Sequence, residues 1–358
     1  MSPDRAFWEG RRVLITGHTG FQGAWLALWL SHLGAKVTGL ALLPAYSPNL
    51  FALALKPHHA KSVFGDIREQ STVAKCMMEA KPEIVFHLAA QALTFVSYQD
   101  PVTTYATNVL GTVHLLEAIR KAGSVVAAVI ATSDKCYENE EQEEAYTEEA
   151  TLGGLDPYSS SKACAELAVR AYRKSFFNRI DDQHCRFASA RAGNVIGGGD
   201  WSPYRLVPDL VRAASTGASA AIRDPAGIRP WQHVLEPLSG YIRLAESLAR
   251  TNGPEYAEAW NFGPALEDTR PVSYLVESFI AAWGEGARWH QAGTDAGVEA
   301  GILKIDSSKA LSSLGWRRRL DLKGGLDWTF DWYFRQQRGA DAEVITLDQI
   351  ERYESLKA

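Results

Sequence analysis

Tyr158 and Lys162 form a pair whose types and spacing suggest chemistry. They are four residues apart, so on a helix they share one face. A phenol with an ordinary pKa of about 10 is a poor base at neutral pH, but a neighbouring ammonium group favours the phenolate. The pair therefore predicts a proton acceptor for an alcohol that is being oxidised. Taken alone, the same spacing also fits an amphipathic helix with a surface lysine.

More polar groups stand about twenty residues earlier, at the end of an apolar run. Ser133, Asp134 and Lys135 follow the run Val125–Thr132, which has the composition of a buried strand. A hydroxyl, a carboxylate and an amine at a strand end join the Tyr–Lys pair as candidate catalytic groups.

A glycine-rich turn lies close to the N-terminus, between an expected strand and an expected helix. Its glycines follow the spacing G-x-x-G-x-x-G. Such a turn lets the backbone approach a pyrophosphate, which then meets the N–H groups at the start of the helix. The alternative is glycine used only for tight packing. The expected dinucleotide-binding residues are Gly17, His18, Thr19, Gly20, Phe21, Gln22 and Gly23.

The segment after this turn lacks the charged residue that often contacts the adenosine ribose. No side chain from Val37 to Leu55 is charged, whereas an acidic residue suits NAD and an arginine suits NADP. We expect neutral groups such as Tyr46, Ser47 or Asn49 to hold the ribose. NAD is the predicted cofactor, because no cation is available for a 2′-phosphate. Further expected contacts are Asp66 and Ile67 at the adenine, and Leu88, Ala89 and Ala90 beside the cofactor.

Short apolar runs alternate with segments of helical period over the first 200 residues, as in βαβ units. The expected strands are Val13–Thr16, Val37–Leu42, Ser62–Gly65, Ile84–Leu88, Val125–Thr132 and Phe187–Ala190. The expected helices are Gly20–Leu33, Glu69–Ala80, Val102–Lys121 and Tyr158–Phe177. The fold class is therefore α/β, a doubly wound parallel sheet of Rossmann type with a smaller mixed α/β C-terminal lobe. We expect residues 1–200 to bind the dinucleotide, with a return of the chain at 232–264, and residues 201–358 mainly to bind substrate.

Composition limits the function classes. The 358 residues carry 37 Lys and Arg against 42 Asp and Glu, a net charge of −5, which does not favour nucleic-acid binding. No apolar run approaches the ~20 residues of a membrane span, nothing resembles a signal peptide, and we expect a cytoplasmic location. The four cysteines lack metal-site spacing, so they are expected to be free, and no metal is expected.

One local bias stays open. The segment Glu138–Glu149 contains seven glutamates. A solvated loop is one interpretation, and its place after a strand end allows a lid over a site as another.

With these motifs in place, the chain resembles the extended short-chain dehydrogenase/reductases that act on nucleotide sugars. The glycine turn, Ser133 and the Tyr–Lys pair are common to that superfamily. Longer segments are similar to those of the 4,6-dehydratases that act on CDP-glucose, and the similarity runs from Trp8 to Tyr353. These segments are Trp8–Gly10, Thr132–Asn139, Arg229–Pro237 and Lys304–Ala310.

The resemblance implies an internal redox cycle in deoxysugar biosynthesis, as for lipopolysaccharide O-antigens. Tyr158 would take the C4 hydroxyl proton while a hydride passes to NAD, and Ser133 would hydrogen-bond the same oxygen. Water would then leave across C5–C6, with Asp134 as the general acid. In dTDP-glucose dehydratases a Glu occupies the position of Lys135. Lys135 is therefore either the C5 base or a cation that stabilises the enolate.

The resemblance also implies substrate and subunit contacts. Candidate contacts to the diphosphate or sugar are Asn194, Arg205, Arg229 and His233. A homodimer, with a tetramer possible, is expected through the helices Val102–Lys121 and Tyr158–Phe177, the second of which carries the apolar Ala163, Leu167, Ala168 and Ala171. The competing interpretations are a 4-epimerase, a dehydratase for another nucleotide sugar, and a non-catalytic regulator that senses a dinucleotide.

Overall fold

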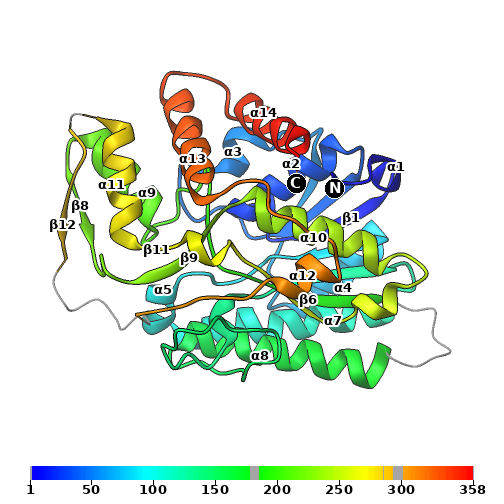
Figure 1. Cartoon of the computed structure of the whole chain (residues 1–358). Coiled ribbons are helices and arrows are strands. Elements are labelled where there is room, and N and C mark those ends of the chain that lie inside the picture. Colours follow the sequence, from blue (N-terminus) through cyan, green and yellow to red (C-terminus); the bar gives the residue numbers. More distant parts are fainter. Residues whose placement is uncertain (1, 178–184, 285, 293–300, 358) are drawn as a thin grey trace.

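A seven-stranded parallel sheet forms the centre of the molecule (Figure 1). The computed structural model describes residues 2–177, 185–284, 286–292 and 301–357. The strand order is β3-β2-β1-β4-β5-β6-β10, and each neighbouring pair is parallel. In chain order the strands are β1 (Arg12–Thr16), β2 (Lys36–Ala41), β3 (Ala60–Phe64), β4 (Ile84–His87), β5 (Ala127–Ala131), β6 (Arg186–Ala192) and β10 (Ala259–Phe262). The order reverses between β1 and β4, which is where doubly wound sheets bind ligands.

Helices cover both faces of this sheet (Figure 1). On one face lie α2 (Phe21–His32) and α10 (Leu235–Leu248), with the C-terminal α13 (Leu322–Gln337) and α14 (Ala342–Ser355) outside them. On the other face lie α4 (Gln70–Ala80), α7 (Gly111–Lys121) and α8 (Pro157–Tyr172). The strands are therefore apolar on both sides, as a covered parallel sheet requires.

The remaining elements form the lobe and the connections. Two small sheets belong to the lobe: β7 (Asn194–Ile196) with β9 (Ile228–His233) and β11 (Thr269–Pro271), and β8 (Ser219–Ile222) with β12 (Arg288–Gln291). The other elements are α1 (Arg5–Trp8), α3 (Leu50–Ala54), α5 (Thr94–Gln99), α6 (Pro101–Tyr105), η1 (Ala106–Leu110), η2 (Asp134–Cys136), η3 (Arg173–Phe177), α9 (Leu206–Thr216), η4 (Gly253–Tyr256), η5 (Leu266–Asp268), α11 (Val272–Trp283) and α12 (Ser308–Ser312).

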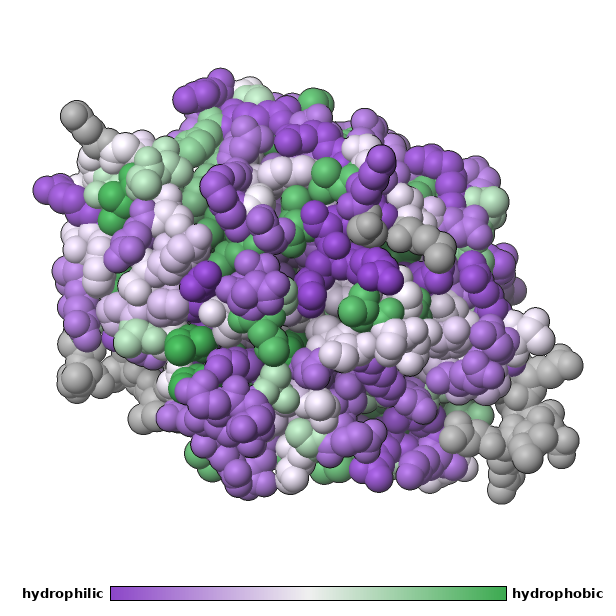
Figure 2. Space-filling view, in the orientation of Figure 1, coloured by the Kyte–Doolittle hydropathy of each residue, from purple (hydrophilic) through white to green (hydrophobic). Residues whose placement is uncertain are grey.

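The surface mixes hydrophilic and hydrophobic residues. On the face shown in Figure 2, hydrophilic side chains predominate and hydrophobic ones lie between them in small groups. Within the described ranges, no helix is both long and apolar enough to cross a membrane.

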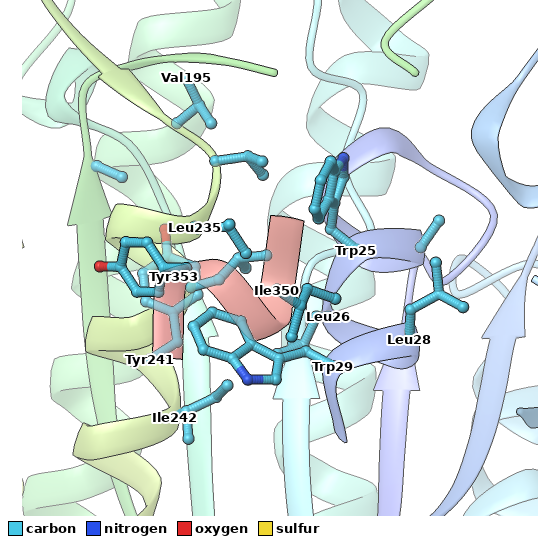
Figure 3. Packing of buried hydrophobic residues seen from close by; sticks show 14 of the residues in the cluster. Trp25, Leu26, Leu28, Trp29, Val195, Leu235, Tyr241, Ile242, Ile350 and Tyr353 are labelled. Atoms are coloured by element: carbon cyan, nitrogen blue, oxygen red, sulfur yellow. The ribbon is translucent and has the colours of Figure 1, made fainter. Parts of the chain in front are cut away.

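The core on the α2 side joins both ends of the chain (Figure 3). Trp25 and Trp29 of α2 are fully buried beside α10 and α14. The ring centroids of Trp29 and Tyr353 are 5.6 Å apart in an edge-to-face arrangement, and Trp29 Nε1 donates a hydrogen bond to Glu354 at 2.7 Å. The C-terminal helix thus packs against the first helix of the Rossmann unit.

The expected fold class is confirmed, including all six strands and the four helices of the first 200 residues. Two helices differ in detail. Tyr158–Phe177 is divided into α8 and the π-helical turn η3, and Val102–Lys121 is divided into α6, the π-helical turn η1 and α7. Asn108 lies in that turn, and its side chain bonds Gln91 and Ser161. Such a turn inside a helix re-aims a side chain at a functional site.

The chain does return to the sheet after residue 200, through β10. Because α10 and α14 also pack on the Rossmann side, the division into residues 1–200 and 201–358 stays a prediction.

Candidate active site

A cavity of about 1070 Å³ opens at the carboxyl ends of the central strands. Its walls come from the loops after β1, β2, β3, β4, β5 and β6, from α5, and from the lobe segments 200–209 and 221–229. This is the edge at which doubly wound sheets hold their ligands.

The glycine-rich turn lines this cavity and is packed tightly. Gly17 has φ +81°, and a Cβ there would lie 2.6 Å from the Ala89 nitrogen. A Cβ at Gly23 would collide with the Gly17 carbonyl. Helix α2 begins at Phe21 with Gly20 at its N-cap and no side-chain cap, so its first N–H groups remain available to an anion.

His18 departs from the expectation for this turn. Its side chain is fully buried, and its ring fills the space above Gly39. Its Nε2 lies 3.0 Å from Ser62 Oγ, and burial lowers its pKa to about 4. His18 is not among the cavity-lining residues. The structure therefore makes its side chain part of the core, so only its backbone can serve a cofactor.

The region after β2 is neutral, as the sequence indicates. Tyr46 lines the cavity, and its hydroxyl lies 2.6 Å from Ser202 Oγ on the lobe. Asn49 instead caps α3 by accepting a hydrogen bond from the Ala52 nitrogen, and neither it nor Ser47 lines the cavity. Of the three candidates for the ribose, the structure brings only Tyr46 to the site.

A cation that the sequence analysis overlooked lies at the next strand end. Arg68 lines the cavity together with Asp66 and Ile67. Its Nη2 and Nε lie 2.6 and 2.8 Å from Asp66 Oδ2, and the hydrogen bond from Arg68 lowers the pKa of that carboxyl. The pair is an Asp–Arg unit two residues apart, which the spacing alone does not distinguish from a surface turn.

The structure brings the expected catalytic residues together on the cavity wall. Their local structure follows from capping, because Ser133 caps the short turn η2, while Asp156 caps α8 and Pro157 occupies its first turn. The five residues are Ser133, Asp134, Lys135, Tyr158 and Lys162.

Tyr158 and Lys162 share a buried face of α8. Lys162 Nζ lies 5.9 Å from the centroid of the Tyr158 ring. Burial raises the pKa of Tyr158 to about 12, partly offset by a hydrogen bond with Ser133. Burial also lowers the pKa of Lys162 to about 8. The protein alone thus keeps the phenol protonated, and positive charge arriving with a ligand would favour the phenolate.

Asp134 is a buried carboxyl beside these groups. Ser133 Oγ donates to its Oδ1 at 3.0 Å, and burial raises its pKa to about 6. The Nζ of Lys135 donates a hydrogen bond to Thr94 Oγ1 of α5 at 3.2 Å. The arrangement supplies one carboxyl that holds its proton to higher pH than usual and one amine within the same cavity.

Three of the four expected substrate contacts line the cavity, namely Asn194, Arg205 and Arg229. Arg205 lies 3.9 Å from Asp200, and buried Arg229 donates to the carbonyls of Ile228 and Gly301. His233 is placed elsewhere, with its ring edge-on to Trp25 and Trp328 in the core. Burial lowers its pKa to about 3, so the expected contact of its side chain with substrate is not supported.

Helix α5 contributes residues that no motif indicated. Ser97 Oγ accepts a hydrogen bond from the Tyr158 nitrogen at 3.2 Å, and Thr94 contacts Lys135. The ring of Phe95 contacts that of Tyr204 of the lobe in a tilted arrangement, with centroids 4.5 Å apart, and Tyr204 has φ +62°. Backbone in this region is unusual for a tyrosine and is often found at functional sites.

The glutamate-rich segment is not positioned as a lid. None of the residues Glu138–Glu149 lines the cavity. Buried Tyr146 stacks on Tyr137, while Glu141 and Glu143 contact Gly301 and Lys304. The segment is therefore attached to the loop that contains Gly301 and Lys304, and it does not line the cavity.

The potential metal ligands that cluster in the described structure lie away from the cavity lining. Within the described residues, the one group of three potential ligands is His58, His59 and Glu343, and none of them lines the cavity.

A parallel sheet with a glycine turn and a Tyr–Lys pair at its carboxyl edge defines a dinucleotide-binding enzyme class. The model of the NAD dependent epimerase/dehydratase family matches residues 13–263, and the chain belongs to this family. Over 354 residues it is 48% identical to the CDP-glucose 4,6-dehydratase of Salmonella typhimurium strain LT2, covering 98% of each chain. It is 25% identical to a dTDP-glucose 4,6-dehydratase of Xanthomonas campestris, covering 95% of this chain and 97% of that one.

Solved structures agree on the fold. An epimerase of Methanothermobacter thermautotrophicus matches with a TM-score of 0.79 at 22% identity, covering 93% of this chain and 95% of that one. A dTDP-glucose 4,6-dehydratase of Streptomyces venezuelae with NAD bound matches with a TM-score of 0.78 at 24% identity, covering 92% and 98%.

Proposed function

We propose that this protein catalyses the NAD-dependent dehydration of CDP-D-glucose to CDP-4-keto-6-deoxy-D-glucose. The observation that carries this proposal is the placement of a buried, proton-holding carboxyl, Asp134, in one cavity with Tyr158 and Lys162. The 48% identity with a CDP-glucose 4,6-dehydratase along 98% of both chains supports the choice of reaction and of nucleotide.

The cofactor site fits NAD in the residues that line it. The glycine turn offers free N–H groups for a pyrophosphate, and the neutral wall after β2 suits a ribose without a phosphate. The residues proposed to hold it are Gly17, Thr19, Gly20, Phe21, Gln22, Gly23, Asp66, Ile67, Leu88, Ala89, Ala90, Tyr158 and Lys162. When bound, NAD would supply the acceptor for the hydride from C4 of the sugar and the source of the hydride for C6.

The first half of the reaction is a proton transfer at C4. Tyr158 takes the proton of the C4 hydroxyl, and Ser133 hydrogen-bonds the same oxygen. Lys162 stabilises the phenolate through its charge. Loss of this proton together with the C4 hydride, for which NAD would be the acceptor, leaves a ketone that acidifies the hydrogen on C5.

The second half is loss of water across C5 and C6. Asp134 donates its proton to the leaving C6 hydroxyl, for which a pKa near neutrality is suited. Lys135 stands in the same cavity. It removes the C5 proton as an amine or stabilises the enolate as a cation, and the variants described in the Discussion separate these roles.

Arginines of the lobe are proposed to bind the diphosphate, since the guanidinium group matches two phosphate oxygens. Arg205 and Arg229 line the cavity with Asn194. Residues 201–358 are accordingly proposed to bind mainly the nucleotide sugar, and residues 1–200 the dinucleotide.

We also propose a cytoplasmic homodimer that supplies deoxysugar biosynthesis. In the described structure, Val102, Leu110 and Leu167 are more than half exposed on the two helical segments expected at the interface. Ala163, however, is already buried within the subunit. Sedimentation at micromolar concentration tests the dimer, and a monomer would contradict it.

Product analysis tests the proposed reaction. Purified protein with NAD is offered CDP-, dTDP-, UDP- and GDP-glucose in separate reactions. We expect a 4-keto-6-deoxy sugar from CDP-glucose at a rate well above the others. A C4-epimerised product would instead indicate an epimerase, a preference for another nucleotide would correct the substrate, and no turnover of any sugar would overturn the proposal.

A further inference from the structure

A buried ion pair lies directly behind the catalytic groups. Glu166 of α8 and Arg191 of β6 are each about 3% exposed, and Arg191 Nη2 lies 2.8 Å from Glu166 Oε2. Although burial alone would raise the pKa of Glu166, the charge of Arg191 and several hydrogen bonds lower it below its usual value. The carboxylate is therefore ionised and fully engaged inside the protein.

Glu166 anchors the start of the turn that carries Ser133, Asp134 and Lys135. Thr132 Oγ1 donates to Glu166 Oε1 at 2.5 Å, and Thr132 immediately precedes Ser133 and Asp134. Ser189 Oγ of β6 donates to the other carboxylate oxygen at 2.8 Å. One carboxylate thus ties the end of β5 to the neighbouring strand.

Arg191 holds the other end of the same turn. Its Nη1 donates to the Tyr137 hydroxyl at 2.9 Å and to the Glu148 carbonyl at 3.1 Å. The Tyr137 hydroxyl in turn donates to Asn261 Oδ1 at 2.6 Å. The turn that carries Ser133, Asp134 and Lys135 is consequently anchored on both sides by the two partners of a single ion pair.

The pair also fixes this turn relative to the proton acceptor. Glu166 lies one helical turn beyond Lys162 and two beyond Tyr158 on the same buried face of α8. Burial lowers the pKa of Lys162, and the negative charge of Glu166 partly offsets that shift because it favours the charged form of the lysine. A well-packed apolar pair would be as stable in such a site as a buried ion pair, so geometry and charge are the properties that this pair adds.

We propose that Glu166 and Arg191 are positioning residues, whose ion pair holds the Ser133–Cys136 turn against α8 so that Ser133 and Asp134 face Tyr158 and Lys162. This inference rests on the proposed function of those four side chains. Misplacement of reacting groups by about 1 Å can slow an enzyme about a hundredfold, and the pair prevents such movement.

Two matched variants test the proposal without removing either charge. Thr132→Val and Ser189→Ala each delete one hydroxyl that donates to Glu166. Only Thr132 directly precedes the Ser133–Cys136 turn. We expect Thr132→Val to lower kcat about tenfold or more with KM within about twofold, and Ser189→Ala to lower kcat less than about threefold. Thr132→Ser, which keeps the hydroxyl, should restore most of kcat. Equal losses in the two variants would show a merely structural role.

A third variant tests whether Arg191 must contact both Glu166 and Tyr137. Arg191→Lys keeps the charge but replaces the planar fork, whose two arms contact Glu166 and Tyr137, with a single ammonium group. We expect kcat to fall about tenfold or more while the protein stays folded by circular dichroism. The control is Arg186→Lys on the same strand, since the guanidinium of Arg186 donates to the carbonyls of Leu248 and Arg250 and not to the turn. Retention of kcat within about twofold in Arg191→Lys would overturn the proposal.

These assays distinguish a failure of the proposed function from a failure of the proposed positioning role. All variants are measured with the nucleotide sugar that the unmodified protein turns over fastest. If that protein has no activity on any sugar, the proposed function fails. If it is active and Thr132→Val behaves like Ser189→Ala, only the positioning role fails.

Discussion

Ser133 Oγ donates a hydrogen bond to Oδ1 of Asp134 at 3.0 Å, while Oδ2 of the same buried carboxyl has no hydrogen-bond partner within the described part of the chain. A carboxyl in this setting holds its proton to higher pH than usual, because burial disfavours the charged form. Its second oxygen is therefore left to bond a group of the ligand, as a general acid requires.

Asp134→Asn should separate activity from stability. We expect kcat to fall about a hundredfold or more, because the amide cannot give a proton to the leaving hydroxyl. Since the folded pKa of about 6 exceeds the usual 3.8, the native state binds more protons than the unfolded state between pH 4 and 6. Stability falls as the pH rises through that window, and at pH 8 the carboxylate costs about 3 kcal/mol.

The asparagine variant avoids that cost. Its Tm should therefore exceed that of the unmodified protein at pH 8, and the difference should vanish near pH 4. Thermal unfolding at the two pH values measures this. A Tm at pH 8 equal to or below that of the unmodified protein would contradict the buried, proton-holding carboxyl.

Tyr158→Phe removes the proposed proton acceptor and little else. We expect kcat to fall about a hundredfold or more with the Tm nearly unchanged. Tyr105→Phe is the matched control, because the Tyr105 hydroxyl donates to Ser160 at the protein surface and lies outside the cavity lining. Activity in Tyr158→Phe within about threefold of the control would exclude the phenol as the acceptor.

Lys135 variants separate its two possible roles. Lys135→Met should abolish exchange of the C5 hydrogen with solvent deuterium, measured by NMR, and with it dehydration. Lys135→Arg keeps a cation that cannot act as a base at neutral pH. Exchange that returns in the arginine variant assigns Lys135 to enolate stabilisation, and exchange lost in both assigns it as the base. Full exchange in Lys135→Met would eliminate both roles.

Cofactor choice depends on a pair beside the third strand. Arg68 is held by Asp66, so we expect NAD to restore activity to cofactor-stripped protein far better than NADP. Asp66→Asn should release Arg68 and raise the ratio of NADP to NAD activity about tenfold, since a free guanidinium can bind a 2′-phosphate. Glu69→Gln, a neighbouring carboxylate outside the cavity lining, should leave the ratio unchanged. A native preference for NADP would contradict the assignment.

The sequence predicts well what depends on period and turn chemistry. Alternating apolar runs placed all six expected strands, and the four-residue spacing of Tyr158 and Lys162 correctly put them on one helical face. The same helical spacing places Glu166 on this face, so the sequence alone could have indicated that residue. Its partner Arg191 was not, because that contact depends on how β6 lies beside α8.

The sequence did not reveal the direction in which a side chain within a motif points. His18 lies between cavity-lining residues, yet its ring turns into the space left by Gly39 on the adjacent strand. His233 similarly turns toward Trp25 and Trp328, which are more than 90 residues away in either direction. Only tertiary packing decides such cases, and the same holds for the attachment of the glutamate-rich segment to Lys304.

The proposed reaction transfers hydrogen internally, within one sugar. CDP-glucose deuterated at C4 is incubated with the protein and NAD, and the 4-keto-6-deoxy product is analysed by NMR and mass spectrometry. The proposed reaction predicts that deuterium leaves C4 and appears at C6 of the same molecule. Deuterium retained at C4, or lost to free cofactor or solvent without appearing at C6, would contradict it.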